Sequence, residues 1–242
     1  MDALIVAVLW GMALQMRDPI EILILALATW LTYVADRLRD VEPGRGVLST
    51  DRHLYYGNHY KLFCGLWLGG FALVILMALL VLPFWKTGWG LVIVAGILLY
   101  LWLVRNIEHA GKRLLLKRTA VPLIFAVGVC WMSEGWRSHA GIYMTVLLLA
   151  GAMVNVLLIS YWENRDKELP KWLPHLLGAS LVGMFCLSQF GLVYFTVPGI
   201  GGLVTAFAYF VILLLVQAGK VVHVRAWSDL ALAAGAMVIM VG

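Results

Sequence analysis

The 242-residue chain is 63% hydrophobic and only 13% charged, and its mean hydropathy is +0.92. A soluble domain is nearer half apolar and about a quarter charged, so this composition excludes an ordinary soluble domain and predicts a polytopic membrane protein. The net charge of +5 does not indicate nucleic-acid binding, because membrane proteins concentrate Lys and Arg on one side of the bilayer.

Hydrophobic runs predict nine membrane helices in one integral-membrane domain that covers residues 1–242. A spanning helix needs about 20 apolar residues, and lipid leaves no water to satisfy a bare backbone. The runs are continuous rather than alternating, which argues against a β-barrel. The predicted fold class is therefore an all-α polytopic bundle. In chain order its helices cover 3–15, 19–35, 62–84, 88–104, 119–133, 141–162, 173–192, 198–218 and 221–241.

The basic residues agree with this count. The connections after the even-numbered helices hold 15 of the 18 Lys and Arg residues, and the opposite side holds only Arg17, Lys86 and Arg137. The positive-inside rule then predicts a cytoplasmic N-terminus and an external C-terminus. We expect the protein in a bacterial inner (cell) membrane.

Two carboxylates stand where the second predicted helix ends. Asp36 and Asp40 are four residues apart, so they share one face of a helix. Arg45 and Arg52 follow in the connection 36–61. Carboxylate oxygens bind Mg²⁺ and Arg side chains bind phosphate oxygens, so the pattern indicates a metal-bridged diphosphate site. On spacing alone, a helix end with local Asp–Arg pairing fits equally well.

Two further polar clusters lie on the same predicted side. Lys117-Arg118-Thr119 directly precedes the fifth predicted helix, where positive-inside anchoring is the ordinary explanation. Glu163 and Asp166 follow the sixth helix and are three residues apart. A second acidic cluster at the same membrane face is what a two-metal site needs, although a mixed-charge turn closed by Pro170 fits the pattern too.

The other polar residues give weaker signals. Asp229 lies four residues after Arg225 inside the last predicted helix, and we expect the two to form a buried ion pair. His53 and His59 do not make a zinc site, since no third ligand has suitable spacing. A transporter would need polar residues along the midplane, which the third, fourth, seventh and eighth predicted helices almost lack.

The order of these clusters resembles the UbiA superfamily of intramembrane prenyltransferases. Asp36-Arg37-x2-Asp40 is similar to the latter part of the family's first motif, NDxxDxxxD, and Arg52 falls where the family has a loop arginine. Lys117-Arg118-Thr119, with Pro122 beyond it, resembles the family's KRxT…P…G segment. Residues 155–166 occupy the place of its second Asp-rich motif.

This resemblance implies Mg²⁺-dependent transfer of an isoprenoid group from a prenyl diphosphate to a lipophilic, often aromatic, acceptor. It also implies that membrane lipid surrounds the bundle. The implied metal-binding and catalytic residues are Asp36, Asp40, Glu163 and Asp166; the diphosphate-binding residues are Arg52, Lys117 and Arg118; the wall residues are Tyr33, Asn155 and Tyr161. Neutralising the departing diphosphate would lower the barrier to transfer.

The chain departs from the first motif at Thr32 and Tyr33, where the family has Asn and Asp. Loss of the Asp carboxylate weakens metal and diphosphate binding. The alternative function is therefore a non-catalytic lipid-binding or assembly protein on the same scaffold, which predicts that the acidic pairs point apart or bind Arg. A CDP-alcohol phosphotransferase also uses intramembrane Asp and Mg²⁺, but its DGxxAR…GxxxDxxxD pattern is absent.

Overall fold

The computed structural model describes residues 2–41, 51–107, 110–163, 172–217 and 224–241, and every regular element in these ranges is helical. The elements are α1 (Asp2–Ala13), α2 (Pro19–Asp40), α3 (Asp51–Asn58), α4 (Tyr60–Val81), α5 (Phe84–Asn106), α6 (Ala110–Met132), η1 (Gly135–Arg137), α7 (His139–Glu163), α8 (Trp172–Tyr194), α9 (Val197–Gln217) and α10 (Val224–Val241). Each of the nine predicted membrane segments overlaps a helix of the structure, namely α1, α2 or one of α4 to α10.

Among the described residues, seven helices, α2 and α4 to α9, are long and apolar enough to cross a membrane. Two shorter apolar stretches, Leu4–Ala13 in α1 and Ala226–Val241 in α10, complete the set. The protein is therefore a polytopic helical membrane bundle.

Helix boundaries differ from the prediction near the charged segments. The connection 36–61 contains α3, and α2 continues through Asp40 instead of ending at 35. The expectation that Lys117-Arg118-Thr119 precedes the fifth membrane helix is wrong, because these residues lie inside α6. Leu, Lys and Arg are strong helix formers, so a helix continues beyond its apolar stretch into such a sequence.

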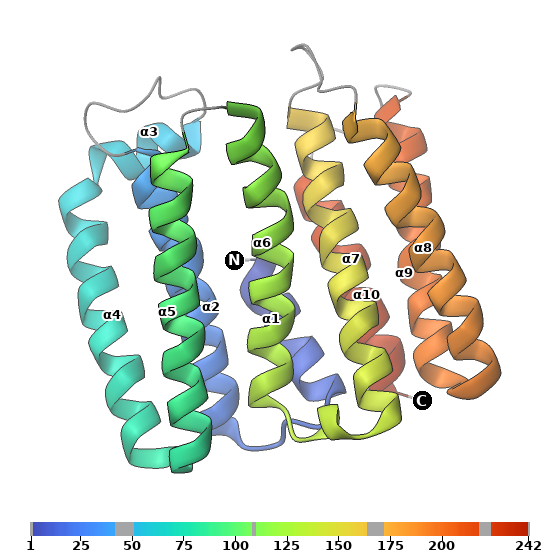
Figure 1. The fold of residues 1–242 in the computed structure, drawn as a ribbon, viewed down its shortest axis with the longest axis horizontal. Coiled ribbons are helices and arrows are strands. Elements are labelled where there is room, and N and C mark those ends of the chain that lie inside the picture. The colour runs from blue at the N-terminus through green and yellow to red at the C-terminus, as the bar shows by residue number, and fades with distance from the viewer. Residues whose placement is uncertain (1, 42–50, 108–109, 164–171, 218–223, 242) are drawn as a thin grey trace.

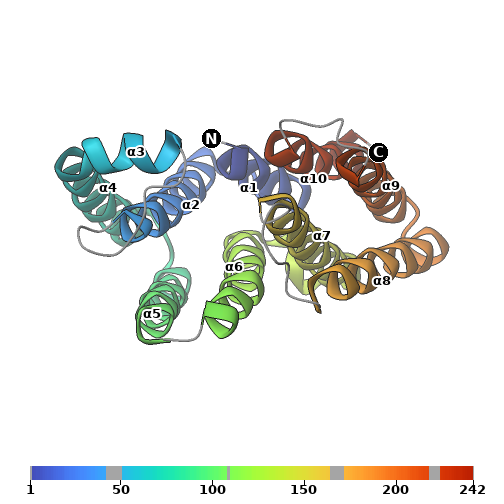
Figure 2. The same cartoon turned by 90° about the horizontal axis from the view of Figure 1, so that it is seen from above.

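The helices stand side by side, and α3 lies across one end of the bundle (Figure 1). Seen from above, α2, α4 and α5 lie on one side of α1, α7 to α10 lie on the other, and α6 lies across from α1 (Figure 2). The buried core draws on α1, α2, α6 and α7 to α10. By contrast α4, all of whose residues the structure describes, has no buried residue.

Glycines allow the second half of the bundle to pack closely. A Cβ at Gly199 in α9 would lie 2.7 Å from the Cα of Leu192 in α8, which is too close for any side chain. A Cβ at Gly202 would meet the hydroxyl of Ser188. Small residues thus let α8 and α9 approach each other closely.

Two ends of the bundle are distinguished below. The Asp36 end holds the C-terminal ends of α2, α5, α7 and α9, and it includes the helix ends that flank the four Lys- and Arg-rich connections (top of Figure 1). The Lys86 end is the opposite one. The side of the membrane that each end faces stays a prediction of the positive-inside rule.

A buried lysine joins three helices at the Lys86 end. Lys86 lies in the first turn of α5 and is 2% exposed, although the sequence pattern places it among the external charges. Its Nζ lies 2.6 Å from Oε1 of Glu21 in α2 and donates to the carbonyl oxygen of Met132 in α6 at 3.5 Å. The charge is thus compensated inside the bundle by two neighbouring helices.

Candidate functional site at the Asp36 end

Asp36 is the centre of the candidate site. It lies on the last turns of α2 and is half-buried. Its Oδ1 accepts a hydrogen bond from Nη2 of Arg39 at 2.8 Å, and the Nζ of Lys117 in α6 lies 3.6 Å from the same oxygen. The structure therefore brings together the first acidic motif and the Lys-Arg-Thr segment, which are far apart in the sequence.

Two further cations, Arg37 and Arg118, are the sequence neighbours of Asp36 and Lys117. Arg118 follows Lys117 and is 1% exposed, so its guanidinium group is enclosed by the bundle. The guanidinium carbon of Arg37 lies 4.9 Å from the ring centroid of Tyr33, one helical turn earlier in α2. Tyr33, expected as a wall of the prenyl or acceptor site, thus packs against a cation near the Asp36 end.

The described side chains at this position carry more positive than negative charge. Arg39 and Lys117 bind one oxygen of Asp36, and Arg37 and Arg118 lie beside them in the same two helices. Arg and Lys side chains attract anions, and one Arg guanidinium group can bind two phosphate oxygens at once. Phosphate is therefore the ligand chemistry that these residues suit.

The rest of the expected acidic set gives no test of a metal site. The side chains of Asp40, Glu163 and Arg52, and the whole of Asp166, lie outside the described residues. Among the side chains that the structure does describe, no three His, Cys, Asp or Glu residues are grouped to hold a metal ion. Asp36 is the one expected Mg²⁺ ligand whose surroundings are known.

Asn155 forms its hydrogen bonds away from Asp36, with residues of α10. Its Nδ2 donates to Oδ1 of Asp229 in α10 at 2.7 Å, and its Oδ1 accepts from the hydroxyl of Ser228. Asn155 therefore joins α7 to α10, rather than forming described contacts with Asp36 or Lys117. The expected pair of Asp229 with Arg225 stays a prediction, since the Arg225 side chain lies outside the described part of the chain.

Two further residues complete the comparison. Tyr161, the third expected wall residue, is partly buried against the hydrophobic core near the C-terminal end of α7. Ser228 was not identified from the sequence; its only signal was a polar pair, Ser228-Asp229, inside an apolar helix.

Replacing Asn155 by Ala is expected to lower the free energy of unfolding by about 1–3 kcal/mol, because Ser228 and Asp229 lose partners inside the bundle. Thermal unfolding in detergent measures the change. The control is Ser188→Ala, whose hydroxyl donates to the Met184 carbonyl of its own helix and whose loss costs about 0.5 kcal/mol or less. Equal effects of the two substitutions would contradict a bridging role for Asn155.

Comparison of this chain with known protein families, curated proteins and solved structures finds no match.

Proposed function

We propose that this protein is a divergent Mg²⁺-dependent prenyltransferase of the UbiA type, which binds a prenyl diphosphate at the Asp36 end. The observation that carries the proposal is the contact between Asp36 and Lys117, with Arg118 enclosed beside it. Asp36 comes from the segment for which the family resemblance implies metal binding, and Lys117 and Arg118 come from the segment for which it implies diphosphate binding. Their spatial proximity is what a shared site requires.

The described donors fit both parts of a magnesium diphosphate. Asp36 offers hard carboxylate oxygens to Mg²⁺, and it is half-buried rather than sealed in the core. Asp40, Glu163 and Asp166 are the proposed further ligands. When bound, Mg²⁺ would supply positive charge to the diphosphate oxygens.

The protein's own residues would bind the diphosphate and shield the reacting carbon from water. Lys117 and Arg118 would hold the diphosphate and stabilise the negative charge that grows on it as the bond to the prenyl carbon breaks. The apolar helices would keep water from the allylic cation, with Tyr33 and Tyr161 as aromatic walls. A lipophilic acceptor would then attack that cation, and the proton displaced from the acceptor would pass to the released diphosphate.

The proposed orientation places this site at the cytoplasmic face of a bacterial inner membrane. The Lys- and Arg-rich connections are adjacent to the helix ends of the Asp36 end, as the positive-inside rule requires of a cytoplasmic face. Prenyl diphosphates carry several negative charges, so a site open to the cytoplasm could receive them from water.

The test is binding of a non-hydrolysable prenyl diphosphate analogue to purified protein, followed by transfer from a labelled prenyl diphosphate to aromatic acceptors. We expect binding that strengthens with Mg²⁺ and is lost with EDTA, and transfer with the same dependence. Binding measured without an acceptor keeps the test independent of the acceptor's identity. Affinity that is the same with and without Mg²⁺ would contradict the proposal.

The second candidate is a non-catalytic lipid-binding or assembly protein on the same scaffold. One observation favours it: Asp36 binds Arg39 of its own helix, which is the pairing expected of a carboxylate that holds no metal. This candidate predicts no transfer to any acceptor and no effect of Mg²⁺ on analogue binding. The two measurements above therefore separate the candidates.

A further inference from the structure

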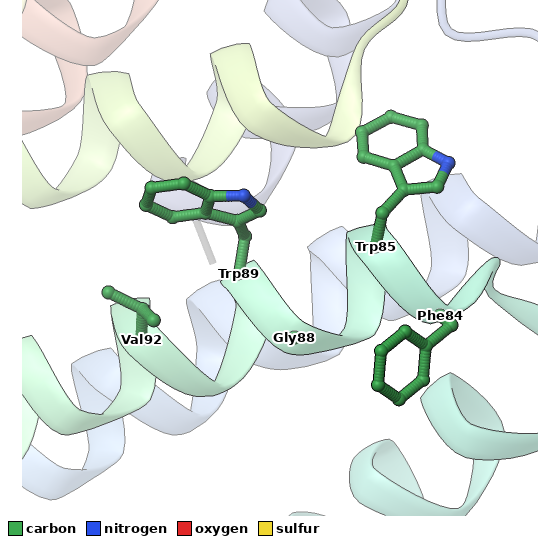
Figure 3. A pocket seen from close by; sticks show the side chains of 5 residues that line it. All are labelled: Phe84, Trp85, Gly88, Trp89 and Val92. Atoms are coloured by element: carbon green, nitrogen blue, oxygen red, sulfur yellow. The ribbon is translucent and has the colours of Figure 1, made fainter.

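An apolar groove runs along α5 at the Lys86 end. It has a volume of about 350 Å³ and is lined by Phe84, Trp85, Gly88, Trp89 and Val92. In Figure 3, Trp85 and Trp89 project from one side of α5, Phe84 projects from another, and Gly88 lies between them. The Phe84 side chain is 93% exposed, so the groove opens toward the membrane rather than toward the core.

The aromatic wall of the groove is braced by α6. The ring centroid of Trp131 lies 5.7 Å from that of Trp85 and 5.0 Å from that of Trp89. A Cβ at Gly88 would have no described atom within 4 Å, so the glycine leaves the floor of the groove open. The rings of Trp85 and Trp89 beside the open surface at Gly88 offer apolar contact to one side of an acyl chain.

Two exposed charges of opposite sign stand next to the aromatic wall. The guanidinium carbon of Arg137 lies 5.4 Å from the ring centroid of Trp85. Glu134, with its side chain 79% exposed, has Oε1 3.9 Å from Nζ of Lys86, the residue next to Trp85. Lys86 is itself buried against Glu21 at 2.6 Å, whereas the side chain of Arg137 is exposed.

We propose that this groove binds a zwitterionic phospholipid of the ethanolamine class, with one acyl chain along Gly88, the phosphate at Arg137 and the ammonium group at Glu134. Arg binds phosphate oxygens and a carboxylate pairs with an ammonium group, so the two charges complement both parts of this headgroup. Tryptophan side chains are suited to the boundary where headgroups meet acyl chains. A purely anionic headgroup would have to lie beside Glu134, which opposes it.

Filling the groove gives the sharpest test. Gly88→Leu is expected to weaken retention of phosphatidylethanolamine about tenfold in native mass spectrometry of the detergent-purified protein. The matched control is Gly96→Leu on the same helix. A Cβ at Gly96 also meets no described atom within 4 Å, but Gly96 does not line the groove. Equal retention by the two variants would overturn the site. A loss of dimer in place of lipid would assign the groove to a second copy of the chain and would overturn it too.

A second experiment tests the assignment of the headgroup. In mixtures of phosphatidylethanolamine and phosphatidylglycerol, Glu134→Gln is expected to shift retention toward phosphatidylglycerol, and Arg137→Gln to lower retention of both. An unchanged preference in Glu134→Gln would overturn the assignment of the ammonium group. Binding of the prenyl diphosphate analogue at the opposite end should be the same in all four variants, so this proposal and the proposed function fail separately.

Discussion

Replacing Lys86 by Met is expected to destabilise the protein by about 3–5 kcal/mol, because it leaves the Glu21 carboxylate inside the bundle without its counter-charge. The Lys86 side chain is 2% exposed, that of Glu21 is 12% exposed, and their charged atoms are 2.6 Å apart. The same substitution also removes a donor from the Met132 carbonyl oxygen. Denaturant unfolding in detergent measures the loss.

The double substitution Lys86→Met with Glu21→Leu is expected to recover most of that loss. Removing both charges leaves neither group unpaired, and buried pairs replaced by apolar residues are often neutral or better. The coupling energy of the double-mutant cycle then reports the pair itself. Arg17→Met, an exposed cation at the same end, is the control and should change stability by about 0.5 kcal/mol or less. A loss below about 1 kcal/mol for Lys86→Met would contradict the structural role of this pair.

The burial of Lys86 could not be predicted from the sequence. Hydropathy places a single Lys between two apolar runs at a membrane boundary, where an anchor in the headgroup region is the ordinary outcome. Its partner Glu21 lies 65 residues earlier in the chain. Only the packing of α2 against its neighbours brings the two charges together.

The helices themselves were predictable because lipid forces each long apolar run to satisfy its own backbone. The helix boundaries were harder to predict from the sequence. Hydropathy marks the apolar part of a helix, but α2 continues to Asp40 and α6 begins at Ala110, well before Lys117. Both extensions are polar, and local helix propensity, not hydrophobicity, carries them past the apolar stretch.

For the candidate site, the sequence predicted which residues share an end of the bundle, but it did not predict which of them are in contact. The charge pattern predicted Asp36 and Lys117 at the same membrane face, and the contact between their side chains follows only from the packing of α2 and α6. Asn155 shows the limit, since its polar side chain equally suited a ligand site and a bridge between helices. Its contact with Ser228 and Asp229 depends on α7 packing against α10, which no spacing within the chain reports.

Asp36→Ala is expected to lower Mg²⁺-dependent prenyl transfer by a factor of about 100 or more, on the scale found when one preorganised electrostatic contact at a reacting charge is removed. The substitution removes a proposed metal ligand and leaves Lys117 and Arg39 without the carboxylate that they now contact. Transfer from a labelled prenyl diphosphate at saturating Mg²⁺ measures the effect.

Stability separates this outcome from a purely structural role. The Asp36–Arg39 pair joins residues three apart on one helix and is partly exposed, so its loss should cost only about 0.5 kcal/mol. Asp18→Ala is the matched control at the other end of α2, where the carboxylate accepts a hydrogen bond from the backbone of Ile20. Losing that cap costs about 1 kcal/mol, yet transfer should be unchanged.

The two aspartates thus make opposite predictions on one helix. Asp18→Ala should reduce stability more than Asp36→Ala, and Asp36→Ala should abolish nearly all transfer while Asp18→Ala preserves it. Lys117→Met extends the comparison, because Lys117 and Asp36 are proposed to act on the same diphosphate, and the double substitution should then cost less than the sum of the single ones. Full transfer by Asp36→Ala would remove Asp36 from the reaction, and additive losses would contradict the joint action of Asp36 and Lys117 on one diphosphate.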